Sequence, residues 1–143
     1  AVRSEVPSRT SAARILDLFE SVHGRFQRGR EFSTSLKAFM DDMKASGLGD
    51  RVTVLAFSEF GRRVKENASA GTDHGTSGPV FVAGESVNAG LLGEYPSLAE
   101  LQDGDLKTTT DFRSIYSSLL TDWLEIDSQQ PLGGNFESLN IWG

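Results

Sequence analysis

The residues of this chain that could do chemistry gather in one polar stretch, residues 58–75, which reads "SEFGRRVKENASAGTDHG". It contains the carboxylates of Glu59 and Asp73, the imidazole of His74 and the guanidinium of Arg62. Carboxylate and imidazole groups are ligands for Zn, Mn or Mg, and a guanidinium binds anions. A metal or anion site is one interpretation of this pattern, and a solvated loop is the other.

Two apolar runs flank this stretch and would have to position it. Residues 52–57, "VTVLAF", are apolar on both faces, which is typical of a central strand in a parallel sheet. A second buried strand is expected in "PVFVAGE", where Pro79 is acceptable at the first position. Ligands bind beyond the carboxyl ends of strands in an open parallel sheet. The polar segments after both strands are therefore expected to converge at one edge.

Apolar residues recur at helical spacing in three further segments, residues 15–26, 32–43 and 112–124. A residue among 109–111 is expected to cap the last helix, and Gly47 or Gly49 to end the second. Residues 84–108 are rich in glycine and predicted to be irregular, and the aromatic tail is expected to dock on the body. Helices next to buried strands predict one α/β domain over residues 1–143.

Composition narrows the function classes. The net charge is −6, which argues against a nucleic-acid surface; the basic cluster Arg25, Arg28, Arg30 is more simply a solvated helix end. There is no cysteine, so any metal would be held by carboxylate, imidazole and water. No run is apolar enough to span a bilayer, and the start has no apolar signal core.

The pair "SEFGRR…GTDHGT" and the run "TTDFRSIY" resemble the bacterial DUF1501 family, and the resemblance covers about residues 33–143. Residues 1–32 are a weakly matched helical lead-in. The resemblance places the chain in the alkaline phosphatase/sulfatase-like superfamily, as a C-terminal portion. It implies an α/β/α sandwich of the alkaline phosphatase type, with a short, mostly parallel sheet flanked by helices. It also implies export to the periplasm or beyond.

In that superfamily two metal ions activate a serine or threonine nucleophile, and two registers carry the ligands over. In the first, Asp73 and His74 are the adjacent Asp-His pair. In the second, which fits the strand order better, Glu59 replaces the aspartate of a "Ser-Asp-His-Gly" motif and Phe60 replaces its histidine. Either register keeps Glu59, Asp73 and His74 near the site. If the chain derives from such a hydrolase, these three residues would be the remaining metal ligands, with Arg62 as an anion contact.

The upstream part of the superfamily pattern departs further. The segment 21–23, "SVH", stands where the family has Asp-Thr-His, and His23 is more simply a helix-face residue than a ligand. The nucleophile would lie further upstream, so no catalytic residue is identified.

These departures favour a degenerate or partial member of an exported, metal-dependent phosphatase/sulfatase-like family that acts as a non-catalytic structural or assembly subunit. The alternative is a phosphoric or sulfuric ester hydrolase whose nucleophile half is supplied elsewhere. A third hypothesis is an anion-binding module built on Arg62, Arg63 and loop amides. An incomplete sheet would expose an edge and apolar surface, so a protein partner or a homo-oligomer is expected.

Overall fold

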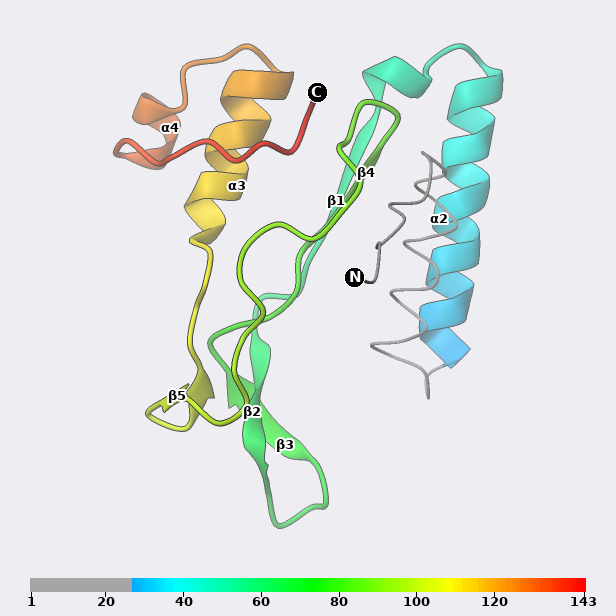
Figure 1. Cartoon of the computed structure of the whole chain (residues 1–143). Coiled ribbons are helices and arrows are strands. Elements are labelled where there is room, and N and C mark those ends of the chain that lie inside the picture. The colour runs from blue at the N-terminus through cyan, green and yellow to red at the C-terminus, as the bar shows by residue number, and fades with distance from the viewer. Residues whose placement is uncertain (1–26) are drawn as a thin grey trace, which may run out of the picture. The chain divides into compact units, whose positions relative to one another are not determined.

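The computed structural model describes residues 27–143 (Figure 1). The predicted helix 15–26 and His23 lie outside this range. The described elements, in chain order, are α2 (Gln27–Ala45), the 3₁₀ turn η1 (Gly49–Arg51), β1 (Thr53–Ala56), β2 (Gly61–Glu66), β3 (Thr72–Gly75), β4 (Phe81–Gly84), β5 (Leu101–Gln102), β6 (Asp105–Leu106), α3 (Phe112–Ser118), the π-helical turn η2 (Leu119–Trp123) and α4 (Gln129–Leu132).

The chain divides into two compact units. The first comprises residues up to Leu55 together with Phe81–Ala89, and the second comprises Ala56–Val80 with Gly90–Gly143. None of the helices in the described range is long and apolar enough to cross a membrane.

The first unit confirms the predicted helix over residues 32–43. Helix α2 ends at Gly47, whose φ of +69° is left-handed, and the amide of Leu48 donates to the carbonyl of Met43 at 2.8 Å. This is the glycine-terminated helix end expected from the sequence. Lys44 in the last turn forms an ion pair with Glu85 at 3.1 Å, which ties the helix to the residue after β4.

The predicted parallel sheet is wrong, and with it the α/β/α sandwich of the alkaline phosphatase type. β1 pairs with β4 alone, β2 with β3, and β5 with β6, and all three pairs are antiparallel (Figure 1). Parallel neighbours need a crossover connection, usually a helix. The segment between β1 and β4 instead holds the β2–β3 hairpin, so the chain returns in the opposite direction. The strands are also not fully covered, since every residue of β1 is only half-buried.

The second unit carries two hairpins and the C-terminal helices. The turn of the β5–β6 hairpin is formed by Asp103 and Gly104, with φ of +52° and +85°. An Asp-Gly pair is a favoured two-residue hairpin turn because glycine and aspartate tolerate positive φ. The short strands β5 and β6 lie in the region that was predicted to be irregular.

Helix α3 begins at the predicted cap. The side chain of Asp111 accepts a hydrogen bond from the amide of Arg113 at 2.9 Å. The predicted continuous helix to residue 124 instead changes to a π-helical turn at Leu119. The tail docks as predicted, since the amide of Leu139 donates to Ser118 Oγ at 2.6 Å and Ile141 is 3% exposed.

Candidate functional site

The polar stretch forms the β2–β3 hairpin rather than a loop at a sheet edge. Its register sets Arg62 directly opposite His74 and Gly61 opposite Gly75. Arg62 Nη1 also donates to the carbonyl of Thr72 at 2.8 Å, so the guanidinium is bonded to the partner strand. Two of the predicted site residues are therefore brought together by strand pairing.

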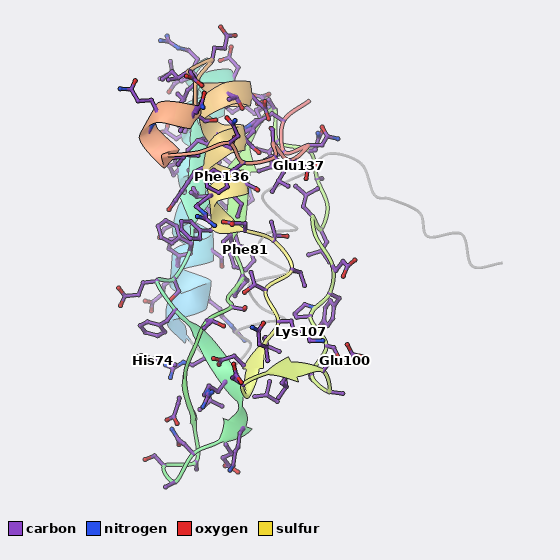
Figure 2. All side chains as sticks on the ribbon, turned by 90° about the vertical axis from the view of Figure 1, so that its left-hand side faces the viewer. His74, Phe81, Glu100, Lys107, Phe136 and Glu137 are labelled. Carbon is purple, nitrogen blue, oxygen red and sulfur yellow. The ribbon has the colours of Figure 1, made fainter. Side chains whose placement is uncertain are left out.

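Phe60 joins this pair from the residue before β2. Its ring stacks on the imidazole of His74 with centroids 3.6 Å apart and an angle of 15° between the planes. The guanidinium carbon of Arg62 lies 5.6 Å from the centroid of the same ring, within cation–π range. Figure 2 shows His74 on the hairpin. The cluster of Phe60, Arg62 and His74 thus combines an aromatic face with two cationic or titratable groups.

Asp73 points away from this cluster. Neighbouring residues of a strand project to opposite faces, so Asp73 and His74 are not on the same side of β3. Asp73 Oδ1 accepts a hydrogen bond from Asn67 Nδ2 at 2.9 Å in the hairpin turn. Glu59 is exposed in the bend before β2. Among residues 27–143, no group of three or more His, Asp or Glu side chains is placed to hold a metal ion.

Arg63 has a role that sequence reasoning missed. It was considered only as part of an anion-binding module, yet its Nε donates to Asp105 Oδ1 at 3.2 Å and its Nη2 donates to the carbonyl of Asp103. The carboxylate of Asp105 is only 16% exposed. One arginine of β2 therefore fixes the β5–β6 turn. The Asp-Gly pair at 103–104 was the signal that could have located this turn.

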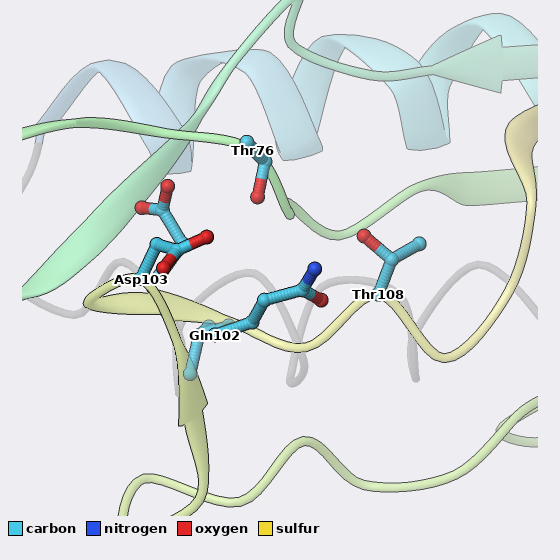
Figure 3. A pocket seen from close by; sticks show the side chains of 6 residues that line it. Thr76, Gln102, Asp103 and Thr108 are labelled. Atoms are coloured by element: carbon cyan, nitrogen blue, oxygen red, sulfur yellow. The ribbon is translucent and has the colours of Figure 1, made fainter.

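A polar hollow of about 250 Å³ lies beside this turn (Figure 3). Two threonine hydroxyls, an amide and two carboxylates face it, and its lining residues are Thr76, Gln102, Asp103, Asp105, Leu106 and Thr108. Ser77 Oγ and Thr108 Oγ1 lie 2.9 Å apart next to it. The hollow adjoins the end of β3, but it could not be predicted from the sequence because Thr76 and residues 102–108 are distant along the chain.

Helix α3 holds a second polar cluster, which is made of buried serines. Ser117 and Ser118 are 1% and 0% exposed. Ser117 Oγ lies 3.0 Å from Ser128 Oγ and donates to the carbonyl of Phe136, while Ser118 Oγ donates to the carbonyl of Ser114. These bonds satisfy the buried hydroxyls and attach the tail to α3, so the cluster is structural.

The shifted pKa values that the structure resolves lie at the start of α3. The hydrogen bond from the Arg113 side chain lowers the pKa of Asp111, with help from the Arg113 amide. The hydrogen bond to the Asp111 side chain in turn raises the pKa of Arg113. The guanidinium carbon of Arg113 also lies over the ring of Phe136, 4.3 Å from its centroid.

Comparison with known proteins gives one match. Neither a curated protein nor a solved structure matches the chain. The family described as "Protein of unknown function (DUF1501)" matches residues 19–130, which is more than half of the sequence and includes both hairpins and α3. The chain therefore belongs to the DUF1501 family.

Proposed function

We propose that this chain works through protein contact, as a non-catalytic structural or assembly part of an exported, phosphatase/sulfatase-like family. The proposal rests on the number of hydrophobic side chains that are exposed compared with the number that are buried. Among the described residues, only Ala83 and Ile141 are buried hydrophobic side chains, while twelve large hydrophobic side chains are exposed. Tyr95 and Leu91 are exposed by 85% and 73%. Apolar surface on this scale is typical of a protein that is covered by another surface.

The arrangement of the candidate ligands supports the same proposal. The imidazole of His74 is stacked on Phe60, and the carboxylate of Asp73 is bonded to Asn67 on the other face of the strand. Both groups are engaged in holding the hairpin together. A metal centre would need several donor atoms directed at one point.

A second function keeps one specific observation in its favour. Arg62 and His74 are cross-strand partners, so a guanidinium and an imidazole share one face of the hairpin. Together with Glu59 they could complete a metal-dependent phosphoric or sulfuric ester hydrolase whose nucleophile comes from another polypeptide segment. In that case a divalent ion (Zn, Mn or Mg) would polarise the ester and the guanidinium would bind the transferred group.

Measurements of bound metal and of ester hydrolysis distinguish the structural function from the hydrolase. The purified chain, the His74→Ala variant and a Lys65→Ala control from the exposed part of β2 are each analysed for bound transition metal by mass spectrometry. The same samples are assayed with an aryl phosphate and an aryl sulfate. We expect no stoichiometric metal and no hydrolysis above the blank in any of them. Stoichiometric metal and hydrolysis that are lost in His74→Ala but kept in Lys65→Ala would replace the structural function by the hydrolase.

A further inference from the structure

One run of apolar side chains in the second unit faces solvent throughout. Leu91, Tyr95 and Leu98 are 73%, 85% and 69% exposed, and Leu92 is 48% exposed. They fall within eight consecutive residues, 91–98, which contain no helix or strand. We refer to these residues as the apolar segment.

The apolar segment is held against the start of α3. Gly93 has a φ of +87°, and a Cβ built on it would lie only 2.5 Å from Thr110 Oγ1, so the backbone passes directly beside residue 110. At the C-terminal end of the segment, Ser97 Oγ accepts hydrogen bonds from the backbone amides of Ala99 and Glu100 at 3.2 and 3.1 Å. The exposed side chains are therefore presented from a defined backbone.

Several large apolar side chains are exposed in this part of the second unit. Phe112, two residues after Thr110, is also 60% exposed. An aromatic side chain carries about 150–250 Å², so Tyr95 and Phe112 alone present on the order of 200–350 Å². Together with the three exposed leucines, these rings expose more apolar area than the singly scattered apolar side chains that are normal on a protein surface.

The charges around the segment are acidic. Residues 90–111 contain five carboxylates and one lysine. Three of the carboxylates are paired: Glu100 with Lys107 (Figure 2), Asp105 with Arg63, and Asp111 with Arg113. The carboxylates of Glu94 and Asp103 have no ion-pair partner in the described part of the chain. Asp103 lies in the β5–β6 turn beside Arg63, so the uncompensated negative charge of the apolar segment itself is that of Glu94.

We propose that the apolar segment is the docking site for a partner protein that presents an apolar face flanked by lysine or arginine. The inference rests on the proposed function and names the surface and the partner chemistry. Charge complementarity selects this occupant, because a lysine or arginine beside the apolar face would meet Glu94. A second copy of a chain with net charge −6 would bring like charges together, and an anionic lipid surface would be repelled by the same carboxylate.

The test uses the full chain and two synthetic amphipathic helical peptides as probes. Both peptides carry the same leucine stripe, flanked by lysines in one and by glutamates in the other. Amide chemical shifts of the chain are followed during each titration. We expect the lysine peptide to perturb residues 91–98 and 112, in a salt-sensitive manner, and the glutamate peptide to leave them unchanged.

Matched variants locate the contact. The double variant Tyr95→Ser/Leu98→Ser should weaken binding of the lysine peptide at least about tenfold, since aromatic anchors dominate interface energies. Glu94→Gln should weaken it less and reduce its salt dependence. Ile126→Ser removes an apolar side chain that is 50% exposed in the same unit, and it should leave binding unchanged. Because all four positions are exposed, the amide spectra serve to show that each variant keeps its fold.

Four outcomes would overturn the docking site. These are equal binding of both peptides, perturbation centred on other residues, binding of phosphatidylserine vesicles through the segment, and photo-crosslinks from position 95 to residues 1–26 or to a second copy in the absence of peptide. None of them bears on catalysis. Conversely, His74-dependent hydrolysis would contradict the proposed structural function, but the peptide titration would still show whether the apolar segment binds. Failure of the structural function and failure of the docking site can therefore be told apart.

Discussion

The imidazole of His74 lies face to face with the ring of Phe60, with centroids 3.6 Å apart and planes 15° from parallel. The contact joins the residue before β2 to the middle of β3, next to the cross-strand pair of Arg62 and His74. Sequence comparison with the superfamily pattern placed Phe60 where a metal-binding histidine would stand. In the structure, the phenyl ring and the remaining histidine contact each other, so a stacking pair occupies the position expected for metal ligands.

The stack should contribute measurably to the stability of the hairpin. In a double-mutant cycle of His74→Ala and Phe60→Ala, we expect a coupling free energy of about 0.5–1 kcal/mol, the lower part of the range for aromatic pairs because His74 is exposed. Urea unfolding of the four proteins measures it. Additive effects of the two substitutions would show that the rings do not stabilise each other.

Removal of Arg63 should destabilise the β5–β6 turn. Arg63→Ala takes away the bonds to Asp105 and to the carbonyl of Asp103, and leaves a mostly buried carboxylate unpaired. Since the guanidinium is 39% exposed and partly screened, we expect a loss of about 1 kcal/mol in the free energy of unfolding. Lys65→Ala, on the same strand, should change it by less than about 0.5 kcal/mol. Equal effects of both substitutions would contradict the assigned role of Arg63.

The attachment of the C-terminal tail should depend on Ser118. Ser118→Ala removes a fully buried hydroxyl that accepts a hydrogen bond from the amide of the half-buried Leu139, which should cost about 1–3 kcal/mol. Hydrogen exchange of the amides of residues 136–141 should accelerate. Ser138→Ala removes a hydroxyl that donates to Asp122 and, at 3.3 Å, to Ser118 Oγ, but it leaves the bond from the Leu139 amide in place and should have a smaller effect. Unchanged exchange in Ser118→Ala would mean that other contacts hold the tail.

The start of α3 should respond to acid. The pKa of Asp111 is lower in the folded chain than its ordinary value of 3.8, because of the Arg113 side chain. A lowered folded pKa means that the stabilisation is present above the unfolded pKa and is lost as the pH falls through the folded pKa. A carboxyl titration of Asp111 followed by NMR should therefore have its midpoint below 3.8. Asp111→Asn keeps a capping acceptor and should remove this acid-dependent loss. A midpoint at or above the ordinary value would contradict the pairing.

Helices α2 and α3 were predictable from the sequence because their signals are local, whereas the short helix α4 was not predicted. The apolar stripe of α2 and its end at Gly47 appeared where expected, as did the cap of α3 at Asp111. The turn from α-helix to π-helix at Leu119 carried no such signal, because the apolar spacing continues through it.

The sheet could not be predicted in the same way, because strand pairing is decided over long distances. An apolar run such as residues 52–57 fits a parallel or an antiparallel partner equally well, and only the intervening segment decides. The stretch 61–75 was interpreted as a loop because of its charges and glycines, yet it forms β2, a tight turn and β3. Because successive side chains of a strand point to opposite faces, Asp73 and His74 lie on different sides of β3 although they are adjacent in the sequence.

The most completely buried side chains of the described residues are Ser33, Ser117 and Ser118, not leucines or phenylalanines. Exposing apolar surface to water raises the heat capacity, and exposing polar surface lowers it. Unfolding of this chain should therefore have an unusually small heat-capacity change for its length, and its stability should vary only gently with temperature. Denaturant should act on it with a correspondingly low m-value, because little surface remains to be exposed.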